Sequence, residues 1–354
     1  MSSSRDFPSL KLHQEHASQN AQLKQPTLTE MWIVSVPLLW FVAGLFLDGW
    51  AHNHKPELES FFTPWHAVFY SGYVVTAISF LCIVWSRMRR YGGTFFANVP
   101  EGFGYAFVGA GFFIVGGIGD LLWHEIFGIE ADIDALLSPT HLVLAVSGFL
   151  MLSTGLRVWF REHPTVDVPN IRTQIPMFIS ASLMISLVWF MTQFSHFIGL
   201  HGVRPEDVVI ADTSQSLAIT GYLFHIAVIT GSFLFIARHA RVAFGGFTLI
   251  FTFSMLAMAL MLDGLAFVPA GFAGGIVADI LSQKLYPFTL HRNQVRAFGF
   301  IVPAAFFAAY FLTLSFTIGI WWSIHLWTGS IVMAGLAGLL TTFLVLPLKE
   351  GDER

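Results

Sequence analysis

Residues 47–66 read LDGWAHNHKPELESFFTPWH, and residues 119–141 read GDLLWHEIFGIEADIDALLSPTH. Each stretch closes one long apolar segment and opens the next. The Asp and the first His lie four positions apart, so they share one face of a helix. The second His follows Thr-Pro or Ser-Pro, which is typical of an N-cap with proline in the first helical turn. The sequence therefore predicts two helical hairpins, each of which gathers Asp, His and His at one end.

These side chains make two candidate metal sites. An ionisable residue at the end of an apolar span is costly unless it is paired or coordinates a cation. Two imidazoles and one carboxylate suit copper, zinc or iron and leave coordination positions open. A hydrogen-bonded Asp–His network that pins the hairpins together is the structural alternative, but the repeated order and the matched caps favour metal. The candidate ligands are Asp48, His52 and His66 in the first set, and Asp120, His124 and His141 in the second.

The composition is that of a polytopic membrane protein. Hydrophobic residues make up 55% of the 354 residues and charged residues only 11%, with long runs almost free of charge. The net charge of -4 is small and scattered, so we expect no nucleic-acid partner. Cys82 is the only cysteine, which excludes disulfides within the chain and a thiolate metal cluster. We expect membrane lipid to surround the protein.

The apolar segments predict an all-α, polytopic membrane bundle of about nine or ten spans. Alternate segments begin about seventy residues apart, which indicates an internal repeat of helical hairpins. The polar residues 1–28 predict a disordered cytoplasmic tail, and residues 29–348 a single transmembrane domain. The segment 270–283 is short and Gly-rich, so it either crosses the membrane or re-enters it. The predicted hairpins are residues 31–102, 103–173, 174–243, 244–290 and 291–348.

The later hairpins carry altered copies of the motif. Thr192 and His196 repeat the four-residue spacing, and His225 follows after a longer connection. His196 and His225 are therefore a candidate degenerate site. The fourth hairpin keeps an aspartate at Asp263 but has Phe267 in place of the histidine. A single His in a membrane helix is more often a packing residue than a metal ligand.

The distribution of arginine predicts the orientation of the chain. Arginines follow the even-numbered spans, whereas the opposite loops are acidic or neutral. We therefore expect a cytoplasmic amino terminus, a location in the bacterial inner (plasma) membrane, and both candidate metal sets near the outer face. Bound ligands need hydrogen-bonding partners around them. The candidates close in sequence are His54, Glu57, Glu59, Glu125, Glu130, Asp132 and Asp134.

The tandem sets resemble those of the C-type membrane subunit of the copper membrane monooxygenases, which oxidise methane and ammonia. In that family, Asp-His-His and Asn-His-His sets bind copper, and the resemblance extends to both sets of this chain. It covers about residues 30–150 and implies copper as the cofactor, with partner membrane subunits or a homo-oligomer. This chain differs from the family because it has Asp120 rather than Asn, a longer gap before His141, and additional hairpins.

Three functions remain open from the sequence. The first is a copper-dependent oxidoreductase of the membrane monooxygenase type, with metal activating oxygen. The second is a protein that transports or stores copper or zinc. The third is a zinc-dependent intramembrane hydrolase, with Glu125 or Glu130 as the base for a metal-bound water. The sequence by itself identifies neither the metal nor the substrate.

Overall fold

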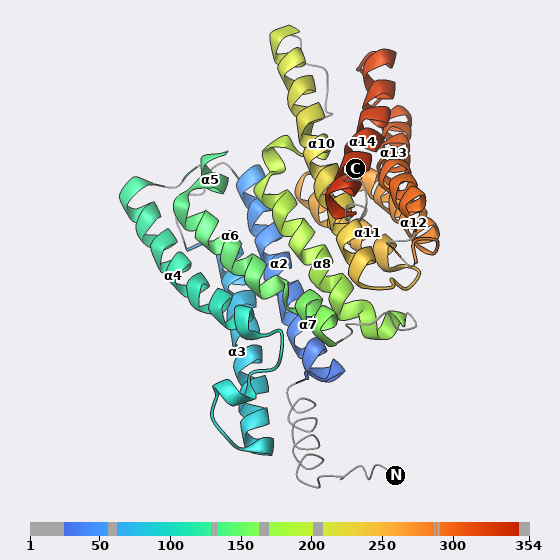
Figure 1. Ribbon diagram of the computed structural model, residues 1–354. Coiled ribbons are helices and arrows are strands. Elements are labelled where there is room, and N and C mark those ends of the chain that lie inside the picture. Colours follow the sequence, from blue (N-terminus) through green and yellow to red (C-terminus); the bar gives the residue numbers. More distant parts are fainter. Residues whose placement is uncertain are drawn as a thin grey trace, which may run out of the picture.

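The chain is an all-α bundle of long apolar helices (Figure 1). The computed structural model describes residues 25–55, 62–128, 130, 133–162, 170–200, 208–286, 288 and 291–346. Within these ranges there is no strand, so the predicted fold class is confirmed. The predicted cytoplasmic tail falls outside the described residues, apart from residues 25–28.

The helices of the first two predicted hairpins lie on one side of the bundle, and the remaining helices lie beside them (Figure 1). The first group is α2 (Leu28–His54), α3 (Pro64–Tyr91), η1 (Phe96–Asn98), α4 (Gly104–Phe127), α5 (Asp134–Leu137), α6 (Pro139–Leu152) and α7 (Thr154–Glu162). The second group is α8 (Ile171–Met191), η2 (Gln193–Ser195), α9 (Phe197–Leu200), α10 (Val208–His239), α11 (Gly246–Met261), η3 (Leu265–Phe267), α12 (Val268–Ser282), α13 (Arg292–Phe316) and α14 (Ile324–Val345).

The lengths of these helices suit a lipid bilayer. Among the described residues, nine helical segments are long and apolar enough to cross a membrane, and α11 is shorter with 16 residues. One of the nine combines η3 with α12, so most of the segment 270–283 lies in a helix of sufficient length. Large apolar side chains such as Phe112, Val115 and Ile118 of α4 are exposed, and lipid is the environment that suits them. The protein is an integral membrane protein.

In each of the two hairpins that carry an Asp-His-His set, glycines allow the two helices to approach closely. A Cβ on Gly72 of α3 would lie 2.6 Å from the Cα of Phe41 in α2, and a Cβ on Gly44 of α2 would lie 2.6 Å from the Cα of Phe69 in α3. In the second hairpin, a Cβ on Gly109 would lie 2.6 Å from a backbone carbonyl oxygen of α6. Small residues at crossings permit such contact between helix backbones. This packing fixes which residues of the paired helices stand at the same level.

Helix α8 connects the two hairpins to the rest of the bundle. Both α2 and α6 contact α8, which also packs on α11. The side chains of α8 are the most buried of any candidate span in the described chain. The first and second hairpins thus both pack against α8. Their ends that carry the Asp-His-His sets face the same region.

Candidate metal centre

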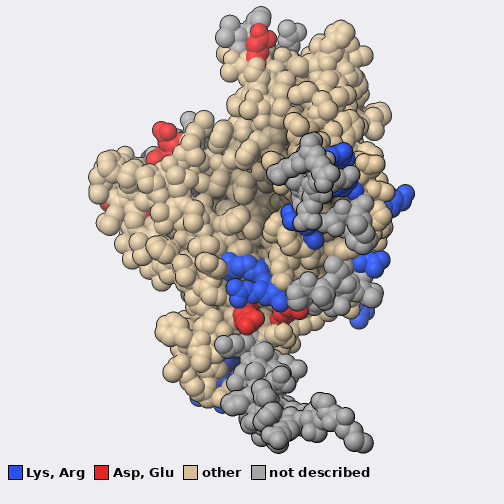
Figure 2. Space-filling model, in the orientation of Figure 1, with Lys and Arg blue, Asp and Glu red and all other residues tan. Residues whose placement is uncertain are grey.

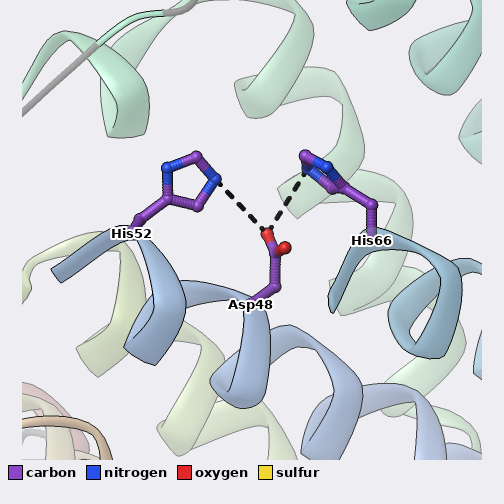
Figure 3. Close-up of side chains that lie close together, drawn as sticks. All are labelled: Asp48, His52 and His66. Carbon is purple, nitrogen blue, oxygen red and sulfur yellow. Dashed lines mark ion pairs between the residues drawn. The ribbon is translucent and has the colours of Figure 1, made fainter. Parts of the chain in front are cut away.

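Asp48, His52 and His66 converge at one end of the first hairpin (Figure 3). Asp48 and His52 lie one turn apart on α2, and His66 comes from the first turn of α3. The Asp48 Oδ2 atom is 3.8 Å from His52 Nε2 and 3.5 Å from His66 Nε2. One ligand atom from each residue lies within 4.8 Å of the other two. Because donors bound to one metal lie within about 4 Å of each other, small side-chain movements would close this set around a cation.

Asp120, His124 and His141 repeat this arrangement in the second hairpin. The Asp120 Oδ1 atom is 3.5 Å from His124 Nε2 and 3.0 Å from His141 Nε2, and one ligand atom from each of the three residues again lies within 4.8 Å of the others. The Asp120 side chain is only 1% exposed. In both sets the structure brings together the three side chains that the sequence spacing predicted.

The residue before each proline orients the second histidine of its set. Thr63 caps α3 by accepting from the His66 backbone N–H at 3.1 Å, and its hydroxyl also lies 3.2 Å from His66 Nδ1. Ser138 occupies the N-cap position of α6, but no backbone N–H donates to its side chain. Its hydroxyl lies 2.8 Å from His141 Nδ1 instead. A histidine that donates its Nδ1 proton to one of these oxygens keeps the lone pair on Nε2. This lone pair lies on the side of the aspartate, where it can bind a cation.

Only part of the predicted supporting set reaches the ligands. Glu130 Oε2 lies 3.2 Å from His124 Nδ1, and the same nitrogen lies 3.3 Å from the Gly128 carbonyl oxygen. His54 instead contacts Asp263, with 2.7 Å between His54 Nε2 and Asp263 Oδ2, because the loop after α11 approaches the end of α2. Glu125 and Asp134 are exposed, and none of their described contacts reaches either set. Glu57, Glu59 and Asp132 lie outside the described residues.

The third repeat forms a buried histidine pair, and no carboxylate of the described residues completes it as a set of three. Thr192 Oγ1 lies 3.0 Å from His225 Nε2, in the role that aspartate has in the first two sets. The His196 and His225 ring centroids are 4.8 Å apart, compared with 5.9 Å and 5.7 Å in the two Asp-His-His sets, and Trp189 packs against both rings. Burial lowers the pKa of His196 well below its usual value. Because no described carboxylate balances a cation here, core packing explains this pair better than a metal site.

Both Asp-His-His sets open into one cavity of about 950 Å³. The spacing of the motifs predicts a set within each hairpin, but it does not predict that the two hairpins face each other. The ligands share the cavity walls with mostly apolar side chains from several helices. These include Phe41, Phe69, Phe113, Leu144, Leu187 and Phe190.

The motif spacing did not predict two further residues of the site. Thr140 Oγ1 donates to Asp120 Oδ1 at 3.0 Å, and Tyr70 lines the cavity with its ring centroid 6.2 Å from that of His66. Tyr70 lies four positions after His66 and therefore on the same face of α3. That spacing was the signal that could have identified it.

The first donor set fits a cation, as the surroundings of its carboxylate indicate. The Oδ1 atom of Asp48 is buried and has no hydrogen-bond partner among the described residues. By contrast, the buried carboxylate of Asp279 accepts from the backbone N–H groups of Phe247 and Thr248 at 3.1 Å and 3.0 Å. An unsatisfied buried acceptor costs about 1–3 kcal/mol, and a charged one costs more. A metal ion bound by both carboxylate oxygens of Asp48 would remove this cost.

Comparisons of the chain with protein-family models, with curated proteins and with solved structures found no match. The function therefore has to be argued from the geometry of the two sets and of the cavity between them.

Proposed function

We propose that this protein is a copper-dependent membrane oxidoreductase whose two Asp-His-His sites act on an apolar substrate in the cavity that they share. The observation that carries the proposal is the shared cavity, since both sets lie in its wall beside apolar side chains. Two imidazoles and one carboxylate leave coordination positions free for dioxygen or substrate. Copper, when bound, would supply one-electron and dioxygen chemistry. The sequence resemblance to the copper membrane monooxygenases supports the same metal.

The residues of the chain have separable roles in this proposal. Asp48 and Asp120 supply the negative charge that balances the cations, and the Nε2 atoms of the histidines complete each set. Thr63 and Ser138 hold the imidazoles through Nδ1. The aromatic and aliphatic walls exclude water and contact the substrate. The cavity volume lies in the upper part of the range of about 300–1,000 Å³ that small-molecule sites have.

The contacts of the site favour the two alternatives less. A zinc hydrolase needs a carboxylate base beside the metal-bound water, but Glu130 contacts the far side of a ligand ring at His124 Nδ1 and Glu125 is exposed. A transport protein needs successive sites along a path through the membrane. Here both sets open into the same cavity, which suits joint action on one molecule better than stepwise transfer. A storage function would not require the apolar walls.

The proposed setting is the bacterial inner membrane, with the amino terminus in the cytoplasm and both sets near the outer face. In the view of Figure 2, the Lys and Arg side chains lie over the lower and middle parts of the molecule, away from the upper ends of the helices. Such an asymmetry is typical of a cytoplasmic face. Partner membrane subunits or a homo-oligomer belong to the same proposal, by resemblance to the monooxygenase assemblies.

Cysteine labelling tests this orientation. In a Cys82→Ser background, we expect a membrane-impermeant maleimide to label Lys55→Cys in intact spheroplasts and Thr94→Cys only after the membrane is permeabilised. Both positions are exposed, and they lie at opposite ends of α3 and its connections. The measurement is the labelled fraction by mass shift on a gel. Labelling of both positions from the same side would refute the proposed topology.

Metal loading and dioxygen uptake test the function. The protein is purified, reconstituted in nanodiscs, loaded with copper or zinc and supplied with ascorbate as reductant. We expect about two copper ions per chain, an EPR signal with nitrogen coupling, and dioxygen uptake above that of an Asp48→Ala/Asp120→Ala control. Tightly held zinc without redox activity would contradict the proposal and favour the hydrolase. Rapid copper exchange without dioxygen uptake would favour transport or storage.

A further inference from the structure

The cavity that holds both Asp-His-His sets is elongated along α2. Residues of this helix line it from Phe41 to His54, and these thirteen positions rise by about 20 Å. A volume of about 950 Å³ spread over this length gives a mean width of less than half the length. A compact molecule would leave most of such a space empty, whereas an extended chain would follow it.

One part of the cavity, between the sets and the middle of the bundle, has the same depth on three helices. On each of α2, α4 and α6, the lining residue farthest into the bundle lies seven positions from a ligand of its set. The pairs are Phe41 and Asp48, Phe113 and Asp120, and Gly148 and His141. Seven helical positions rise by about 10 Å. This part of the cavity, here named the inner section, is therefore about 10 Å deep.

Apolar side chains close the inner section. Phe41 and Phe113 are 2% and 1% exposed, and their ring centroids are 5.3 Å apart. Phe69 stacks on Phe41 with centroids 5.2 Å apart. The lining residues between these rings and the sets are also apolar, and they include Leu45, Leu144 and Ala145. Polar lining residues outside the sets, such as Asn53 and Lys55, follow His52 and so lie at the opposite end of the cavity.

Gly148 determines how far the inner section reaches. A Cβ at this position would lie 3.5 Å from Leu187 Cδ2 and 3.6 Å from Phe41 Cε1, which is ordinary contact. Because both neighbours also line the cavity, a larger side chain would take up the space at the inner end. At Gly109 of α4, by contrast, a Cβ would lie 2.6 Å from a backbone oxygen. Gly109 thus serves the approach of two helices, whereas Gly148 leaves room in the cavity.

We propose that the substrate is a linear hydrocarbon chain of up to about eight carbons, with one end against Gly148 and the other at the level of the two sets. An extended chain advances about 3.5 Å for every three bonds, so a depth of about 10 Å accommodates about eight carbon atoms. This inference rests on the proposed function, because it takes the sets as the reacting end of the cavity. The inner section selects by length, since a longer chain must bend or extend past the sets.

Fluorine NMR with 1,1,1-trifluoroalkanes of increasing length tests the proposal in the full-length protein in nanodiscs. Probe held by the protein gives a signal separate from that of probe dissolved in lipid. We expect bound probe for chains of up to about eight carbons and little for chains of about ten or more. In Gly148→Leu this limit should fall by about two carbons, since the new side chain extends about two bonds beyond Cβ. Gly111→Leu is the matched control, because Gly111 does not line the cavity and no atom lies within 4 Å of a Cβ there.

Gly148→Ala keeps the test decisive if Gly148→Leu does not fold, because its added Cβ is in ordinary contact. Its limit should fall by about one carbon. An unchanged limit in the Gly148 variants, or no bound probe of any length in the parent, would overturn the inference. Copper content and dioxygen uptake are measured on the same preparations. A parent that takes up copper and dioxygen but holds no probe leaves the copper proposal standing, whereas one that holds probe with the expected limit but no copper contradicts the proposed function alone.

Discussion

The His66→Ala variant is expected to keep about one of two bound copper ions while retaining its fold. Each set is complete within its own hairpin, since α2 and α3 supply the first and α4 and α6 the second. Loss of the His66 imidazole leaves Asp48 and His52, which are too few ligands to hold the metal against competition from solvent and chelators. The measurements are copper per chain by elemental analysis and the melting temperature beside that of the metal-free parent.

His54→Ala is the matched control for this experiment. His54 is close to the first set in sequence, but its Nε2 contacts Asp263 at 2.7 Å and its Nδ1 donates to the Trp50 carbonyl at 2.8 Å. We expect this variant to keep both copper ions. Loss of all copper from His66→Ala would show that the two sets form one site. Equal losses from both variants would show that the effect is structural.

The Gly72→Ala variant is expected to lower both the stability of the protein and the occupancy of the first site. The added Cβ would lie 2.6 Å from the Cα of Phe41 and 2.8 Å from its backbone nitrogen. Backbone atoms cannot rotate away, so α2 and α3 must separate, and such overpacking costs about 1–3 kcal/mol. The separation also moves His66 on α3 away from Asp48 on α2, so copper should be lost from that set first.

Gly111→Ala is the control, since the added methyl group meets no atom within 4 Å and alanine favours a helix by up to about 1 kcal/mol over glycine. We expect its melting temperature to equal or exceed that of the parent. The measurements are thermal unfolding in detergent and copper titration with and without the His66→Ala change. A Gly72→Ala variant as stable as Gly111→Ala, with unchanged copper content, would show that α2 and α3 can separate without cost.

The amino-acid sequence determined the features that depend on near neighbours in the chain. Hydropathy fixed the all-α membrane class, because lipid admits helices whose backbone groups are paired internally. The four-residue spacing of Asp48 and His52, and of Asp120 and His124, placed each pair on one helix face. The position of His66 was predictable because Thr63 and Pro64 define where α3 begins.

Only the tertiary structure decided how these elements meet. The shared cavity and the pairing of His54 with Asp263, 209 positions away, both join segments that do not belong to one hairpin. No periodicity encodes them, because they arise from side-chain volumes at helix crossings, such as the space that Gly117 leaves for a phenol. The third repeat shows the same division, because the sequence already places a threonine at position 192, whereas only the structure shows that its hydroxyl lies 3.0 Å from His225 Nε2 and that both histidines are buried.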